Sequence, residues 1–412
     1  MIGEIIAIGD ELTSGRITNT TSGFAAHHLF EAGFDIYAMH TIGDTPALIG
    51  EALKRALKRV DFVLVTGGLG PTDDDLTTEA VSEALNRPTM PNLELLSLIR
   101  QHLEENGEQQ AGSLDKLAWL PEGAETLSPE SKMSGFQLIH KNKPIFFLPG
   151  VPHQMRTLLV EEVLPRLTTW YQGRQRASCQ RIYKIFGKTE QEINLQIKQI
   201  DLGVDATIGY YPVFPDVHLS IIIRGDNQQT IQSHAEKAFQ LIERELGDYI
   251  YGSDRESMAS VLGNLLSKQG KTFSVAESCT GGLVSHLMTS VAGSSTYFLG
   301  GVTSYANSMK ETCLGVDTAL LERVGAVSPE VAESMALGIH TQSTADISIS
   351  ITGIAGPGGG TRQKPVGTVF IGFTHDDTTE VKEFHFSGNR YEIQHLTAQT
   401  ALNLVRQYLL TQ

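Results

Sequence analysis

Segments typical of buried strands alternate with segments typical of helices through roughly the first 165 residues of the chain. Residues 3–9 (GEIIAIG), 35–44 (DIYAMHTIGD) and 61–68 (DFVLVTGG) have the pattern of strands, and residues 20–34 and 45–57 between them have a helical period. Such alternation favours a largely parallel sheet that helices cover on both faces. We therefore expect this region to form an α/β domain.

A chain of 412 residues is too long for a single hydrophobic core, so we expect several domains. We assign residues 1–170 to the first α/β domain. Residues 171–255 mix strand-like and helical segments and predict a small α+β module, and residues 256–412 predict a second α/β domain. In both larger domains an apolar strand runs into a glycine-rich turn, at residues 66–77 and 275–282.

The composition of the chain is acidic, which bears on its partners. The net charge is −15, so we expect the surface to repel DNA and anionic lipid, and no Lys- or Arg-rich run stands out as a basic patch. Three cysteines without a CxxC pair predict neither disulfides nor zinc, and the N-terminal MIGEIIAIGDE lacks the basic region of a signal peptide. Residues 278–309 carry no Asp, Glu, Lys or Arg, but their Gly, Ser and Thr content predicts buried turns and not a membrane span. We expect a cytoplasmic protein without direct contact with nucleic acid or membrane.

The first glycine-rich turn, TGGLGPTDDDLT at residues 66–77, combines glycines with acids. Glycines let a phosphate approach the backbone amides, and the start of the following helix favours an anion. The three carboxylates of residues 73–75 would repel that phosphate unless a hard cation such as Mg²⁺ lay between them. The turn therefore predicts a metal-assisted phosphate site, and a solvated turn with a helix cap is the alternative. The glycines concerned are Gly67, Gly68 and Gly70.

Two further acidic turns support the phosphate-site interpretation. Gly9-Asp10-Glu11 and Gly43-Asp44 each follow a predicted strand. Open α/β sheets bind ligands at the carboxyl ends of their strands, so these acids are expected at the same edge as the glycine-rich turn.

The second glycine-rich turn, VAESCTGG at residues 275–282, places Ser278 beside Cys279 between an apolar strand and an apolar helix. Unpartnered amides at the start of a helix favour a developing negative charge. A neutral serine needs a base before it can act as a nucleophile. A thiolate at a helix start is intrinsically the more reactive group, so the residues alone do not separate the two nucleophiles.

The same domain offers a base for the serine. Lys310 could serve if burial lowered its pKa, with Tyr305 relaying or positioning the proton. Backbone amides near Gly281 or Gly353 could form an oxyanion hole, and Arg390 suits a substrate phosphate. Each feature also has an ordinary structural explanation: Ser278 as a helix cap, Lys310 on the surface and Tyr305 in the core.

Three motifs in the first domain, GDELTSG (9–15), TGGLGPTDDDLT (66–77) and LPGVPHQM (148–155), resemble the N-terminal domain of the CinA family, which is similar to MoaB/MogA-type molybdopterin-binding proteins. The resemblance implies that Asp44 and Asp75 lie at a metal and nucleotide site, with a divalent ion such as Mg²⁺ or Co²⁺. It also implies hydrolysis of ADP-ribose to AMP and ribose 5-phosphate. His153-Gln154 stands where the family has a Glu, which puts this activity in question.

The third domain resembles the nicotinamide-nucleotide amidase domain of CinA proteins through VAESCTGG, SYANSMK, ITGIAGPGGG and GNR. The resemblance implies deamidation of nicotinamide mononucleotide to nicotinate mononucleotide and ammonia, without a cofactor. It matches Ser278 to the nucleophile, Lys310 to the base and Tyr305 to its helper, with Cys279 packed behind. The residues expected to hold the substrate are Thr352, Gly353, Arg390, Gly281 and Gly282.

The middle module resembles the KH-like domain of full-length CinA proteins. It lacks the GxxG loop that clamps nucleic acid, so we expect it to link domains and to support a homodimer. We expect a bifunctional enzyme of pyridine-nucleotide recycling. One alternative is an amidase whose first domain binds a pterin or nucleotide without turnover, and another is a scaffold that acts with recombination proteins during DNA uptake.

Overall fold

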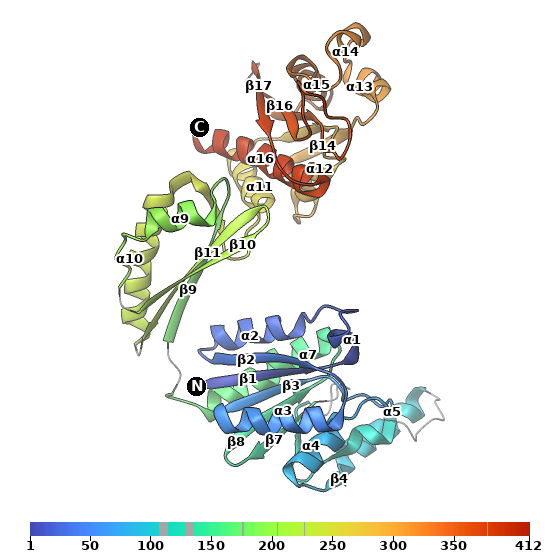
Figure 1. Ribbon diagram of the computed structural model, residues 1–412, viewed down its shortest axis with the longest axis vertical. Coiled ribbons are helices and arrows are strands. Elements are labelled where there is room, and N and C mark those ends of the chain that lie inside the picture. Colours follow the sequence, from blue (N-terminus) through green and yellow to red (C-terminus); the bar gives the residue numbers. More distant parts are fainter. Residues whose placement is uncertain (107–113, 129–134, 175–176, 204, 226, 377) are drawn as a thin grey trace. The chain divides into compact units, whose positions relative to one another are not determined.

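The computed structural model describes residues 1–106, 114–128, 135–174, 177–203, 205–225, 227–376 and 378–412. These residues divide into two compact units, residues 1–178 with 224–228, and residues 179–223 with 229–412. The first unit holds the N-terminal α/β domain, and the second holds a small α+β module and a C-terminal α/β domain (Figure 1). Within these ranges, no helix is long and apolar enough to cross a membrane.

The N-terminal domain is built on a six-stranded sheet with the strand order β2-β1-β3-β8-β7-β6. Strands β1, β2, β3 and β8 are parallel, as expected, whereas β7 runs antiparallel to both of its neighbours. The parallel strands end at one edge of the sheet, where the glycine-rich turn and the acidic turns follow. The strand bounds are β1 Ile2–Ile8, β2 Asp35–Ile42, β3 Phe62–Thr66, β6 Glu125–Thr126, β7 Phe136–His140 and β8 Lys143–Leu148.

Helices cover both faces of this sheet (Figure 1). Helices α2 (Thr21–Glu31), α7 (Pro152–Leu158) and α8 (Leu164–Trp170) bury one face, and α3 (Pro46–Arg59) and α4 (Thr77–Leu85) bury the other. η3 (Leu159–Val163) joins α7 to α8 and packs in the same core as they do. The other elements of the domain are α1 Asp10–Thr13, β4 Thr89–Pro91, α5 Leu93–Asn106, η1 Asp115–Ala118 and β5 Trp119–Pro121.

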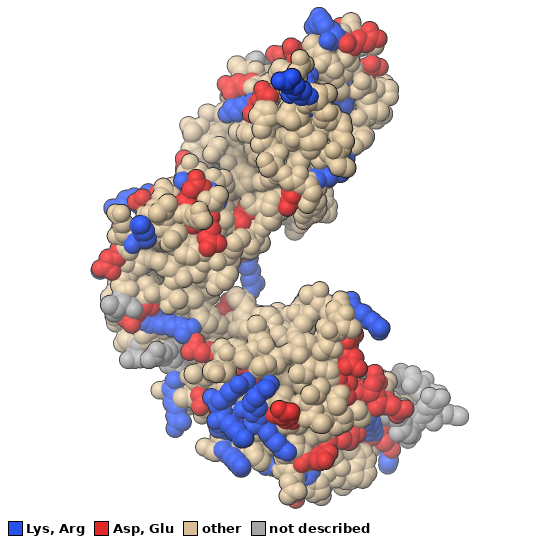
Figure 2. Space-filling model, in the orientation of Figure 1, with Lys and Arg blue, Asp and Glu red and all other residues tan. Residues whose placement is uncertain are grey.

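Helix α3 carries a Lys- and Arg-rich run, KRALKR at residues 54–59, that the sequence analysis did not recognise as a basic patch. Its segment KRALKR exposes Lys54, Arg55 and Lys58 on one side, because the apolar residues between them turn inward at helical spacing. Arg59 at its end is paired with the buried Glu4 at 2.8 Å. Figure 2 shows Lys and Arg side chains gathered over α3 and acidic side chains at the end of the domain that bears the acidic turns.

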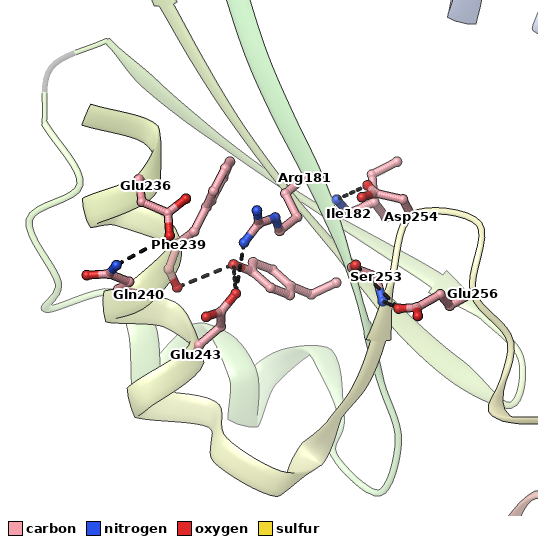
Figure 3. A network of polar contacts seen from close by, with 10 residues as sticks. Arg181, Ile182, Glu236, Phe239, Gln240, Glu243, Ser253, Asp254 and Glu256 are labelled. Atoms are coloured by element: carbon pink, nitrogen blue, oxygen red, sulfur yellow. Dashed lines mark hydrogen bonds and ion pairs between the residues drawn. The ribbon is translucent and has the colours of Figure 1, made fainter. Parts of the chain in front are cut away.

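The middle module has a four-stranded sheet in the order β10-β11-β9-β12, with helices α9 (Glu190–Ile197) and α10 (Gln228–Leu246). Arg181 of β9 donates to Glu243 of α10 at 2.9 Å and lies over the ring of Phe239, which ties the helix to the sheet (Figure 3). The other bounds are β9 Ala177–Ile185, β10 Ala206–Val213, β11 Asp216–Gly225, η4 Gly247–Tyr249 and β12 Ile250–Ser253.

The C-terminal domain has a five-stranded sheet in the order β14-β13-β15-β16-β17, in which β13, β14 and β15 are parallel and β16 and β17 are antiparallel additions. Apolar residues of α11, α12 and α16 pack on one face, and those of α13, α14 and α15 pack on the other. The strands are β13 Phe273–Glu277, β14 Phe298–Thr303, β15 Ile347–Gly353, β16 Thr368–His375 and β17 Thr378–His385. The helices are α11 Met258–Gln269, α12 Leu283–Thr289, η5 Ser294–Thr296, α13 Asn307–Leu314, α14 Thr318–Val324, α15 Pro329–Ser343 and α16 Arg390–Leu410.

Candidate active sites

Ser278 lies in the turn between β13 and α12, at the carboxyl end of a central parallel strand. Its amide donates to the carbonyl of Ile351 at 2.9 Å, which joins the turn to the neighbouring strand β15. Gly281 and Gly282 have φ values of 66° and 98°, a conformation that side chains disfavour, so glycine is needed for the chain to reverse here. The turn therefore holds the serine hydroxyl at the sheet edge where ligands bind.

Glu277, the last residue of β13, is fully buried and supports this turn. Its carboxylate accepts hydrogen bonds from the amides of Gly282 (3.1 Å), Val284 (3.0 Å) and Ser285 (2.8 Å), and from the Ser285 hydroxyl (2.8 Å). These are the amides that a helix start leaves without partners. The role of Glu277 was not predicted from the sequence, although an acid that ends an apolar strand directly before Ser278 was a signal for it.

Lys310, near the start of α13, is only 1% exposed and reaches the serine. Its Nζ lies 3.1 Å from the Ser278 Oγ, 2.7 Å from the carbonyl oxygen of Ser304 and 3.4 Å from that of Tyr305. Both carbonyls can accept the hydrogens of a neutral amine, which directs its lone pair toward the hydroxyl. Burial lowers the pKa of Lys310, which favours this neutral form. The structure thus brings together the nucleophile and base that the sequence predicted.

Cys279 points into the apolar core and is 5% exposed. Burial raises the pKa of its thiol to about 12, so the thiol stays protonated at neutral pH. The carbonyl of Cys279 accepts a hydrogen bond from the Gln394 side chain of α16 at 2.7 Å. The structure therefore favours Ser278 over Cys279 as the nucleophile, a choice that the residue types alone did not allow.

The amides available to an oxyanion are those of Cys279 and Thr280. Among the described residues, neither amide donates to a carbonyl or to another residue's side chain, whereas the Gly281 amide already donates to the carbonyl of Ser278 at 3.1 Å. The expected oxyanion donors near Gly281 therefore do not include the amide of Gly281 itself, because the turn already uses that donor. The buried hydroxyl of Thr280 also lacks a partner within the described ranges.

The hydroxyl of Tyr305 takes a different position from the one expected. It accepts a hydrogen bond from Arg390 at 2.9 Å, and among the described residues no hydrogen bond joins it to Ser278 or Lys310. Only the backbone carbonyl of Tyr305 contacts the amine, so the predicted relay through the phenol does not fit this arrangement. Arg390, the first residue of α16, also donates to the carbonyl of Gly356 at 2.9 Å.

The two remaining predicted substrate residues close the end of β15. Thr352 is buried, and its hydroxyl donates to the carbonyl of Ala326 at 2.7 Å. A Cβ on Gly353 would come within 2.8 Å of the Thr368 carbonyl, so glycine permits the close approach of β16 there. Both residues are thus engaged in packing.

The second candidate site is a cavity of about 450 Å³ at the carboxyl edge of the N-terminal sheet. That volume falls in the range of small-molecule sites. Its wall includes the neutral side chain of Gln154, at the position where the sequence departs from the family pattern. The other lining residues that carry the argument are Gly67, Gly68, Gly70, Glu11, Asp44, Asp74 and Asp75.

The glycine-rich turn of this cavity is held in place by a hydrogen bond within the turn and by Lys116, which lies outside it. A Cβ on Gly67 would lie 2.2 Å from the carbonyl oxygen of Ile8, so only glycine fits. The Thr77 hydroxyl donates to the carbonyl of Gly67 at 2.9 Å. Lys116 donates to the carbonyls of Thr72 and Asp75 at 2.9 and 2.6 Å, and this lysine was not identified from the sequence.

Of the acids expected to bind a metal, Asp10 and Asp44 contact each other, whereas Asp75 contacts Thr72. Asp10 and Asp44 each accept a hydrogen bond from the other's amide, at 3.2 and 2.8 Å, and burial raises the pKa of Asp44. Asp75 accepts hydrogen bonds from the amide and hydroxyl of Thr72. Over the described ranges, no group of three or more His, Cys, Asp or Glu residues converges as a metal site. Carboxylate oxygens around one cavity nevertheless fit a hard cation in their chemistry.

Comparisons with known proteins cover all three domains. The sequence matches the family profiles "Probable molybdopterin binding domain" over residues 4–169, "Damage-inducible protein CinA KH domain" over 180–252 and "CinA C-terminal domain" over 255–409. A CinA-like protein from Desulfotalea psychrophila is 58% identical over 407 residues, which cover 99% of this chain and 98% of that protein. A putative competence-damage inducible protein from Moorella thermoacetica is 37% identical, with 98% of each chain covered.

Solved structures of other CinA-type proteins are similar to part of the chain. The competence/damage inducible protein CihA from Agrobacterium tumefaciens is 38% identical over 38% of this chain and 94% of its own, with a TM-score of 0.36.

Proposed function

Because the chain belongs to the CinA family, we propose that its C-terminal domain hydrolyses the carboxamide of nicotinamide mononucleotide to nicotinate mononucleotide and ammonia. One observation carries the proposal: the Lys310 Nζ is buried and lies 3.1 Å from the Ser278 Oγ, with carbonyls of Ser304 and Tyr305 positioned to take its hydrogens. A buried amine with its lone pair on a serine hydroxyl is suited to act as a general base.

In the first half of the reaction, Lys310 accepts the proton of Ser278 as the serine oxygen attacks the carboxamide carbon. The negative charge that forms on the carbonyl oxygen is stabilised by the free amides of Cys279 and Thr280. Lys310 then returns the proton to the leaving nitrogen, so ammonia departs and an acyl ester remains on Ser278.

In the second half, water replaces ammonia. Lys310 takes a proton from the water, the resulting hydroxide attacks the ester, and the serine oxygen leaves with the proton that Lys310 gives back. Arg390 is a forked cation close to the site through Tyr305 and Gly356, and it suits the phosphate of the nucleotide.

Product analysis tests this proposal directly. The full chain is incubated with nicotinamide mononucleotide, and ammonia and nicotinate mononucleotide are measured together, since amide hydrolysis produces them in equal amounts. Free asparagine serves as a control amide that lacks the pyridinium and the phosphate. Absence of nicotinate mononucleotide over a range of pH would reject the amidase.

For the N-terminal domain we propose hydrolysis of ADP-ribose to AMP and ribose 5-phosphate. The glycine-rich turn and four acids line one cavity of about 450 Å³, which suits a diphosphate approached by backbone amides. A divalent cation, Mg²⁺ or Co²⁺, held by Asp44 and Asp75 with Asp10 and Glu11, would screen the diphosphate charge and lower the pKa of a bound water. Lys116 holds the turn in place through the Thr72 and Asp75 carbonyls.

The alternative for this domain is binding of a pterin or nucleotide without turnover, and the neutral Gln154 in the cavity wall favours it. AMP formation from ADP-ribose, measured with and without Mg²⁺ or Co²⁺, distinguishes the two. Binding of ADP-ribose without AMP formation would support the non-catalytic alternative. The expected homodimer, the cytoplasmic location and the absence of nucleic-acid binding stay predictions.

A further inference from the structure

The turn between β10 and β11 of the KH-like module lies against the C-terminal helix α16. Asp216, at the start of β11, accepts hydrogen bonds from the Tyr251 hydroxyl at 2.7 Å and from the Gln399 side chain of α16 at 3.0 Å. Gln399 is buried, and burial raises the pKa of Asp216. A half-buried carboxylate held by two donors fixes the position of this turn on the helix.

This anchored turn brings an aromatic side chain to the start of α16. The ring of Phe214 lies 6.4 Å from that of Tyr391, centroid to centroid, with the planes tilted by 37°. Tyr391 is itself held by His395, whose ring centroid is 3.9 Å away. Both rings of the pair remain accessible, since Phe214 is 47% and Tyr391 60% exposed.

The first turn of α16 is also where this helix contacts the Ser278 turn. Gln394 donates to the carbonyl of Cys279, and Arg390 donates to the Tyr305 hydroxyl. Tyr391 lies between these two residues in the helix, within one helical turn of each. The aromatic pair is therefore attached to the same helical turn that contacts the candidate active site.

We infer that Phe214 and Tyr391 form an aromatic wall of the amidase site that holds the pyridinium ring of the substrate. This inference rests on the proposed function. A quaternary pyridinium carries a positive charge, which the negative face of an aromatic ring attracts. To hold a flat ring between them, the rings of Phe214 and Tyr391 need to be roughly 7 Å apart. Their present separation of 6.4 Å is slightly less, so a small movement apart would admit the pyridinium ring.

With Phe214 in the aromatic wall, the KH-like module takes part in substrate selection. Phe214 belongs to that module, whereas Ser278, Lys310 and Arg390 belong to the C-terminal domain. The site would therefore prefer a nicotinamide with a charged ring over the same molecule with a neutral ring. Arg390 would hold the phosphate while the aromatic wall holds the ring.

The test measures binding separately from turnover, in the full-length Ser278→Ala protein. Calorimetric titration compares nicotinamide mononucleotide with its dihydro form, which keeps the ribose, phosphate and amide but has an uncharged ring. We expect the charged ring to bind about two- to thirtyfold more tightly. Phe214→Leu keeps apolar bulk but removes the aromatic face, so this preference should shrink toward unity. Phe214→Tyr should preserve it.

Val213→Ala, on the same hairpin and also exposed, is the matched control and should keep the preference. Equal binding of the two ligands by the parent protein, absence of binding, or an unchanged preference in Phe214→Leu would each overturn the inference. A protein that binds the charged ring through Phe214 but releases no ammonia with Ser278 restored would support the aromatic wall and reject the amidase.

Discussion

The two glycine-rich turns follow the same plan, an apolar strand that enters a helix, but they assemble different chemistry. At the turn after β13 a buried amine already contacts the serine, and Glu277 satisfies the start of α12. At the turn after β3 the acids contact backbone amides or a threonine. Among the described residues, no three of them come together around a point that could hold a metal ion. A Ser–Lys pair can be built by the chain alone, whereas a site of like charges needs a cation to bring its acids together.

Replacement of the serine tests the C-terminal half of this comparison most strongly. Ser278→Ala should lower the rate of ammonia release from nicotinamide mononucleotide by about 10⁴- to 10⁶-fold, because no nucleophile remains. Cys279→Ala is the matched control and should keep most of the activity, since that thiol is buried and protonated. Loss of activity in Cys279→Ala with retention in Ser278→Ala would reverse the assignment.

Removal of the amine should have the next largest effect. Lys310→Met should lower kcat/KM by about 10²- to 10⁴-fold, and Lys382→Met, on exposed β17, is the control. The wild-type kcat/KM should fall as pH drops through the pKa of Lys310, because the protonated amine cannot accept a proton. Burial lowers that pKa, so the midpoint should lie below the ordinary lysine value of 10.5. A kcat/KM that does not change with pH anywhere below 10.5 would contradict a lysine base.

The N-terminal half of the comparison is tested by the acidic turn. Asp75→Asn should lower metal-dependent AMP formation from ADP-ribose by about 10- to 100-fold, because loss of this carboxylate weakens the binding of the divalent cation. Asp73→Asn, in the same turn but outside the cavity lining, should change it little. Neither variant should alter ammonia release. AMP formation that survives a chelator would remove the cation from the proposal.

The smallest effect is expected at Glu277. Glu277→Gln keeps the shape of the side chain but removes the charge that four donors share, so it should lower the free energy of unfolding by about 1–3 kcal/mol. Glu322→Gln, on an exposed position, is the control for thermal melting. A positioning role also predicts a lower kcat with an unchanged midpoint of the pH profile. A lower melting temperature with an unaltered kcat would leave Glu277 only a structural role.

Much of the fold could be predicted because its signals are local. The apolar runs that became β1, β3 and β13 were recognisable one at a time, and in the N-terminal domain each parallel strand is followed by a helix. The antiparallel strands β7 and β16 were harder to place, since pairing direction depends on partners far away in the chain. The basic side of α3 was missed because its cations are interleaved with the apolar residues that the helix buries.

The sequence by itself determined the strand–turn–helix units, the glycines that permit the turns and the identity of Ser278 and Lys310 as candidates, because these depend on residue type and short-range spacing. Only the tertiary structure decided which groups meet. It buried Cys279 and raised its pKa, turned the Tyr305 hydroxyl to Arg390, and brought carbonyls of Ser304 and Tyr305 to the amine. Burial and side-chain direction arise from packing between distant segments, which no local pattern records.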